Sequence, residues 1–279
     1  MPTSSLISLL GLLLILVAVI VRVLFWPGYR LQRIQNKAFA DNWLQILRRR
    51  LPFYPSLPVN AQQRLQNLIK VFLHDKHFVG CGGQIIDDDI RVTIAAQACL
   101  LILNRTDNPY QDLNSVLVYP STFVTTREVR DEQGLVSTNH TALLGESWSQ
   151  GKVILAWDNV EAGVRNLHDG HNVVLHEFAH QLDNESGAHN GAPLLVTRGA
   201  YKSWAHVFSQ EFEVLQQQAA EGQISLFDHY GASNPAEFFA VTTETFFERG
   251  KEMRTSHREL FQQLVKFYGI DPTDWHTIN

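Results

Sequence analysis

The chain has 279 residues, of which 45% are hydrophobic and 18% charged, a length that fits one large domain or two modest ones. This composition excludes collagen-like and disordered proteins, and the two cysteines, Cys81 and Cys99, exclude a disulfide-rich scaffold and a four-cysteine zinc site. The net charge of −5 is uneven: residues 22–50 carry seven basic side chains and one acidic one, and residues 51–279 carry 16 basic and 27 acidic ones. An excess of acidic side chains over residues 51–279 is not typical of a nucleic-acid-binding protein, so we expect no nucleic-acid partner.

The first predicted element is an apolar helix over residues 6–26. It contains no charge before Arg22 and would reach about 31 Å as a helix, close to the thickness of a hydrocarbon core. A cleaved signal peptide and a buried core helix are alternatives, but the run lacks a basic start and a small-residue cleavage site. Because a basic block follows, we expect residues 1–27 to be a single-pass anchor in the inner membrane, with residues 28–279 facing the cytoplasm; a soluble cytoplasmic protein is the alternative.

The rest of the chain predicts helices on both flanks and strands between them. Helical periodicity covers residues 31–51, 61–76 and 91–103, strand-forming runs cover residues 115–119, 123–129 and 152–157, and a turn fits residues 131–134. We therefore expect an α+β fold, mainly helical with a small central β-sheet, preceded by the N-terminal transmembrane helix. Within residues 28–279 we expect a helical N-terminal part up to about residue 80 and a catalytic part from about residue 81.

One sequence motif is typical of metal-dependent catalysis. His176, Glu177 and His180 form an HExxH sequence inside an apolar, helix-forming stretch over residues 173–184. Positions i and i+4 lie on one helix face, so both imidazoles can bind one metal ion. The adjacent Glu177 can then take a proton from a water that the metal activates. The pattern predicts a catalytic Zn²⁺ site, one per chain.

A catalytic zinc needs a third protein ligand, which the residues just after the motif do not supply. Asp183 and Ser186 stand where the longer HExxHxxGxxH motif needs Gly and His. The candidates farther along the chain are His189, His206, Glu211, Glu213, His229, Glu237 and Glu244. An Asn-Pro pair at 234–235 predicts the start of a helix with Glu237 and Glu244 on one face. Glu237 also occupies a capping-box position, so spacing alone leaves the ligand open.

The motif and this later helix together carry a family resemblance. The segments HEFAHQLDN (176–184) and YGASNPAEFFAVTTETFF (230–247) resemble the Mlc titration factor A family of zinc peptidases. The upstream runs TIAAQACLLIL, VLVYPSTFV and VILAWDNV look like the same family, so the resemblance covers roughly residues 45–270. It implies a zincin-like metallopeptidase domain that hydrolyses peptide bonds, with aminopeptidase-like activity on small substrates.

The resemblance also implies roles for particular residues. The zinc ligands of the family correspond to His176, His180 and Glu237, and its general base corresponds to Glu177. Tyr230, seven residues before Glu237, corresponds to a phenol that faces the reacting carbonyl.

Two further carboxylates are candidates for supporting the ligands. Asp183 lies three residues after His180 on the same helix face, and Glu244 lies two turns after Glu237. Either could accept a hydrogen bond from a metal-bound histidine.

Two functions of different classes follow. The first is a zinc peptidase acting on a peptide or protein substrate. The second is a regulatory binding protein that sequesters a transcriptional repressor with little turnover, because the resemblance implies such a partner. The intact Glu177 favours the peptidase, since a binding scaffold needs no general base.

Overall fold

The computed structural model describes residues 11–13, 15–17, 19–22, 26–105, 109–121, 123–130, 136–143, 145–148, 151–185 and 187–275. Its helices are α2 (Trp26–Gln35), α3 (Asp41–Arg50), α4 (Val59–Asp75), α5 (Asp88–Leu100), α6 (Trp157–Arg165), α7 (Val173–Asn184), α8 (Arg198–Glu221), α9 (Pro235–Glu248), α10 (Gly250–Ser256) and α11 (Arg258–Tyr268). Three short 3₁₀ helices are η1 (Tyr54–Ser56), η2 (His229–Ala232) and η3 (Pro272–Asp274). The strands are β1 (His77–Gly80), β2 (Ser115–Tyr119), β3 (Phe123–Arg130), β4 (Val136–Leu143), β5 (Gly145–Trp148) and β6 (Lys152–Ala156).

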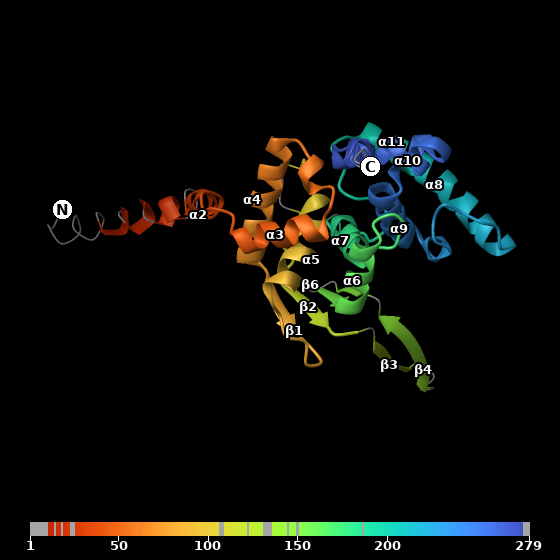
Figure 1. Cartoon of the computed structure of the whole chain (residues 1–279), viewed down its shortest axis with the longest axis horizontal. Helices are drawn as coiled ribbons and strands as arrows, with labels where there is room; N and C mark the ends of the chain where they lie inside the picture. Colours follow the sequence, from red (N-terminus) through yellow and green to blue (C-terminus); the bar gives the residue numbers. More distant parts are fainter. Residues whose placement is uncertain are drawn as a thin grey trace, which may run out of the picture.

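The main sheet is small and mixed, with strand order β1-β2-β6-β5. β1, β2 and β6 run parallel, whereas β5 pairs antiparallel with β6. β3 and β4 form a separate antiparallel pair. Strand β2 buries Val116 and Val118, and β6 buries Val153 and Leu155. Figure 1 shows the sheet on one side of the helical body, so the predicted mainly helical α+β fold is confirmed.

The two helices that carry the HExxH motif and the later Asn-Pro pair lie against each other in the core (Figure 1). Phe178 of α7 is fully buried and packs on Phe72 and Tyr110 at ring-centroid distances of 5.7 and 5.1 Å. Every residue of α9 from Phe238 to Glu248 is buried. This apolar packing holds both helices rigidly, which lets their polar faces form a precise site.

Local signals place these two helices as predicted. α7 covers residues 173–184, and α9 begins at Pro235 after the N-cap Asn234. The Asn234 side chain accepts hydrogen bonds from the backbone N–H groups of Ala236 and Glu237, both at 3.0 Å. Strand β2 also has its predicted bounds, and the turn expected over residues 131–134 lies outside the described residues.

The helix predicted over residues 31–51 is two helices, α2 and α3, separated by residues 36–40. Lys70 of α4 lies at the break, where its ammonium donates to the carbonyl oxygens of Gln35 and Lys37. A side chain from another helix thus holds the segment between α2 and α3.

The predicted transmembrane helix is wrong, and so is the inner-membrane location that depended on it. Within the described part of the chain, no helix is long and apolar enough to cross a membrane. A membrane span needs about 20 consecutive apolar residues in one helix. The first helix with described bounds, α2, has 10 residues and includes Arg30 and Arg33.

Candidate metal centre

Helix α7 presents the motif on its polar face. Its N-cap is Asn172, whose side-chain oxygen accepts a hydrogen bond from the backbone N–H of Leu175 at 3.1 Å. One turn apart, His176 and His180 then point the same way, with ring centroids separated by 4.8 Å.

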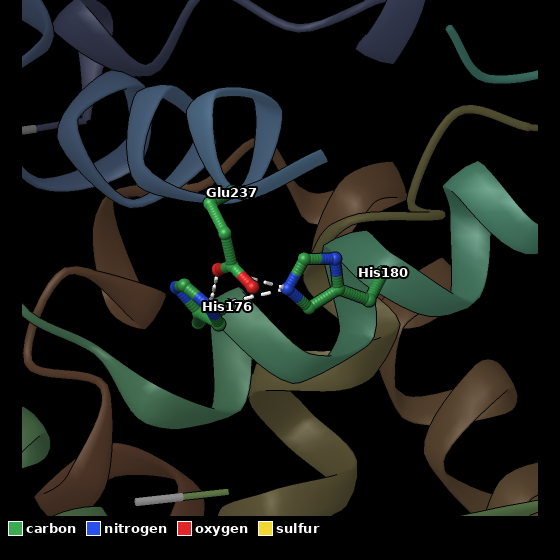
Figure 2. Close-up of side chains that lie close together, drawn as sticks. All are labelled: His176, His180 and Glu237. Atoms are coloured by element: carbon green, nitrogen blue, oxygen red, sulfur yellow. Dashed lines mark hydrogen bonds and ion pairs between the residues drawn. The ribbon is translucent and has the colours of Figure 1, made fainter. Parts of the chain in front are cut away.

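Glu237, in the first turn of α9, faces the two histidines (Figure 2). The Nε2 atom of His176 lies 3.0 Å from Glu237 Oε2 and 3.2 Å from His180 Nε2. His180 Nε2 lies 3.3 Å from the same Glu237 oxygen. Three potential ligand atoms from two helices therefore form a nearly equilateral triangle.

This triangle fits a tetrahedral metal ion. Zinc bonds of about 2.0–2.1 Å to nitrogen and oxygen place neighbouring ligand atoms about 3.3 Å apart. The observed separations of 3.0, 3.2 and 3.3 Å are close to that value. Two histidines and one carboxylate are also a donor set that metallopeptidases use to hold a catalytic zinc. The residues present therefore suit a metal ion.

Glu244, a second carboxylate on this face of α9, contacts the opposite edge of the His176 ring. Its Oε1 atom lies 2.7 Å from His176 Nδ1, and its Oε2 atom accepts a hydrogen bond from the backbone N–H of Asn172. A carboxylate at Nδ1 fixes the proton there and leaves the Nε2 lone pair directed at the triangle. Glu244 therefore contacts the Nδ1 edge of the His176 ring, whereas Glu237 contacts the Nε2 edge, which faces the triangle.

Glu177 lies beside the triangle in a buried environment. Only 3% of the residue is exposed, and its Oε2 atom has no hydrogen-bond partner among the residues that the structure describes. Burial raises the pKa of the Glu177 carboxyl to about 7, although the adjacent His176 and His180 lower it. A carboxyl with a pKa near neutrality can both take and release a proton at physiological pH.

A cavity of about 310 Å³ opens beside Glu177. Its lining includes His176, Glu177, Tyr230, Val241 and Glu244. The Tyr230 ring lies 6.1 Å from the His176 ring, and 56% of this residue is exposed. Burial and the negative charge of Glu237 raise the pKa of the Tyr230 phenol to about 12, so it keeps its proton at neutral pH.

The hydrogen bond that the structure shows for Asp183 joins it to the loop after α7, and its predicted role as an acceptor for a metal-bound histidine stays a prediction. Its Oδ2 atom accepts a hydrogen bond from the backbone N–H of Gly191 at 2.9 Å. The other candidate ligands also lie outside the triangle; these are His189, His206, Glu211, Glu213, His229 and Glu244. Glu211 instead pairs with His257 at 2.8 Å.

The sequence did not predict a role at this site for Asn172 or Glu248. Asn172 donates from its side-chain nitrogen to Glu248 Oε1 at 2.9 Å, and Gly170 N donates to Glu248 Oε2 at 3.0 Å. The N-cap role of Asn172 was readable from its place before an apolar helix. Its contacts with α9 were not, because they join residues more than 70 positions apart.

Glu248 gives a testable pH dependence. Burial raises its pKa to about 8 from an ordinary 4.5, against the hydrogen bond from Asn172, which lowers it; Asp169 and Glu244 raise it further. Between these values the folded state holds a proton that the unfolded state releases, so this contribution to the free energy of unfolding falls as pH rises towards 8. Glu248→Gln removes the effect. We therefore compare the free energy of unfolding of the variant with that of the parent at both pH values. On going from pH 5 to pH 8, this difference should shift in favour of the variant by at least about 2 kcal/mol.

The measurement is urea unfolding of both chelator-treated proteins at the two pH values. A difference between parent and variant that stays constant with pH would contradict the assigned protonation.

An HExxH helix and a distant glutamate beside a small mixed sheet define the class of metallopeptidase-like folds. Residues 26–269 match the family model described as glucose-regulated metallo-peptidase M90, and the chain belongs to this family.

Individual relatives agree with this assignment. A protein of Synechocystis sp., described as uncharacterized, is 40% identical over 273 residues, which cover 98% of each chain. Proteins named Mlc titration factor A from Yersinia pestis and Yersinia pseudotuberculosis are each 31% identical over 245 residues, which cover 85% of this chain and 88% of the relative.

Proposed function

We propose that this chain is a zinc-dependent peptidase whose metal is held by His176, His180 and Glu237. The observation that carries the proposal is the triangle of three ligand atoms, all within 3.3 Å of one another, beside the buried Glu177. A bound Zn²⁺ would act as a Lewis acid and would make a water molecule more acidic. Membership of a metallopeptidase family supports the same function.

Three side chains around the cavity would share the chemistry. The Glu177 carboxylate takes a proton from the attacking water as the water oxygen bonds to the peptide carbonyl carbon. Glu177 then gives the proton to the leaving amine as the carbon–nitrogen bond breaks. The Tyr230 hydroxyl donates a hydrogen bond to the carbonyl oxygen as negative charge develops there. Glu244 keeps the His176 ring in its ligand orientation.

Aminopeptidase-like activity is the finer form of this proposal. The cavity beside Glu177 is also lined by Asp169 and Asp228, and no Lys or Arg is among its described lining residues. Carboxylates of this kind suit the positive charge of a free peptide N-terminus. Peptides with free N-termini should therefore be cleaved faster than the same peptides after N-terminal acetylation.

The direct test of the proposed function is cleavage of a defined peptide library by the zinc-loaded full chain, followed by mass spectrometry. We expect cleavage that stops with 1,10-phenanthroline and returns when zinc is added. A zinc-loaded protein that cuts none of the peptides would contradict the peptidase proposal.

Tyr230→Phe tests the oxyanion role. The variant keeps the ring but loses the hydroxyl, so kcat should fall by about 100-fold, the lower end for loss of an oxyanion donor. KM and zinc content should stay near those of the parent, because the hydroxyl is not a ligand in this proposal. An unchanged kcat in steady-state assays would remove Tyr230 from the mechanism.

Binding of a transcriptional regulator is the second candidate function. The observation that favours it is the name of the 31%-identical relatives, Mlc titration factor A. Calorimetric titration of the full chain with purified Mlc tests it, with Glu177→Gln in parallel. Binding by both proteins would support a regulatory role that needs no turnover, and no heat from either would contradict it.

A further inference from the structure

The loop after α7 meets the first turn of α9 at Gly191. The backbone of Gly191 has φ of +74°, a conformation that favours glycine. A Cβ atom at this position would lie 2.2 Å from the carbonyl oxygen of Pro235 and 2.7 Å from its carbonyl carbon. The loop backbone therefore rests directly on the residue that begins α9, two positions before Glu237.

Both backbone polar groups of Gly191 are held by buried side chains. Its N–H donates to Asp183 Oδ2 at 2.9 Å, and its carbonyl accepts from Trp204 Nε1 at 2.9 Å. Asp183 is fully buried, and Trp204 is 2% exposed. These two side chains come from α7 and α8, so one glycine is fixed from two helices while it touches a third.

The first turn of α9 is less buried than the rest of the helix. From Phe238 onward the helix is buried, but Pro235 is exposed and Glu237 is only partly buried. Core packing therefore fixes the body of α9 better than the turn that carries Glu237. The chain of contacts from His180 runs through Asp183 on the same helix to Gly191, and from Gly191 to the turn with Glu237.

We propose that Asp183, Gly191 and Trp204 form a clamp that sets the position of Glu237 relative to His180 and thereby tunes metal affinity. All three are positioning residues, since none touches the metal triangle. The inference rests on the proposed ligand set of His176, His180 and Glu237. It gives Asp183 a role that acts through the backbone of a loop.

Four variants of the full chain test the clamp. Gly191→Ala places a Cβ against Pro235, Asp183→Ala removes the acceptor, Trp204→Phe removes the indole donor, and Asp183→Asn keeps an acceptor oxygen for Gly191 N–H. The measurements are zinc affinity by competition with a chromogenic chelator and the visible absorption spectrum of the Co²⁺-loaded protein.

The matched control is Phe208→Leu. Phe208 stacks on the Trp204 ring at 3.9 Å, so this variant loosens the same core without touching Gly191. Thermal unfolding of every chelator-treated protein then separates a loss of stability from a loss of metal positioning.

We expect Gly191→Ala and Asp183→Ala to weaken zinc binding by about 10- to 100-fold, the usual effect of losing a partner that orients ligands, and to change the Co²⁺ spectrum. Trp204→Phe should weaken binding by less, and Asp183→Asn should bind within about threefold of the parent. Phe208→Leu should lower Tm and leave zinc affinity unchanged. If Gly191→Ala does not fold, the comparison of Asp183→Ala with Asp183→Asn tests the clamp.

Equal zinc affinity for Asp183→Ala and the parent would overturn the clamp but not the proposed function. The same conclusion would follow if Asp183→Ala lost no more zinc affinity than Phe208→Leu at a similar Tm. A parent chain that binds no zinc would overturn the proposed function and the clamp together.

Discussion

Glu177→Gln should abolish peptide cleavage and leave zinc bound. The substitution keeps the shape of the buried side chain but removes the group that accepts a proton, so kcat should fall by about 10³-fold or more. The carboxylate lies beside the metal triangle without belonging to it, which is why zinc content should stay at one ion per chain. Steady-state kinetics and elemental analysis of the same preparation measure both quantities.

Glu213→Gln is the control for this variant. Glu213 is exposed on α8, outside the metal triangle, and its substitution should change neither quantity. A Glu177→Gln protein that keeps more than a tenth of the parent kcat would exclude Glu177 as the general base. Loss of zinc from this variant would assign it a structural role instead.

Glu237→Ala should have the largest effect on metal binding. It removes one of three ligand atoms, so zinc affinity should fall by more than about 100-fold. Glu244→Ala leaves all three ligands in place and removes only the carboxylate that orients His176, so affinity should fall by about 10- to 100-fold. Competition with a chromogenic chelator at fixed pH gives both values.

The order of these two effects is the critical result. A Glu244→Ala protein that loses zinc entirely, beside a Glu237→Ala protein that keeps it, would reverse the roles that we assign to the two carboxylates. Glu213→Ala serves as the control and should bind zinc as the parent does.

The contrast between Glu237 and Glu244 also shows how far the sequence could predict the site. Their seven-residue spacing places both on one helix face, and spacing alone left the ligand open. The structure explains the ambiguity, because both carboxylates contact His176 but at different nitrogens, Glu237 at Nε2 and Glu244 at Nδ1. Only the relative position of α7 and α9 distinguishes these two edges of one ring.

Local sequence signals correctly predicted the features that depend only on residues close in the chain, such as where a helix lies and where it begins. The HExxH spacing and the Asn-Pro pair at 234–235 gave α7 and the start of α9, because helix periodicity and capping act within one or two turns. Asp183 shows the limit. Its place on the helix face predicted a contact with a histidine, whereas its hydrogen bond from the backbone N–H of Gly191 depends on how a loop returns to the helix, which local signals do not give.

The N-terminal segment shows a different limit. The apolar run over residues 6–26 satisfied the length criterion for a membrane span, which counts residues and assumes one continuous helix. No helix in the described part of the chain meets that requirement. An apolar composition of sufficient length was therefore not enough to predict a membrane-spanning helix.

The central claim is that His176, His180 and Glu237 together hold one zinc ion. Anomalous X-ray scattering from crystals of the zinc-loaded full chain, recorded on both sides of the zinc absorption edge, tests it most directly. We expect one strong anomalous peak per chain, at bonding distance from His176 Nε2, His180 Nε2 and a Glu237 oxygen. A peak bound by other residues, or no peak in a protein that has been given zinc, would contradict the account.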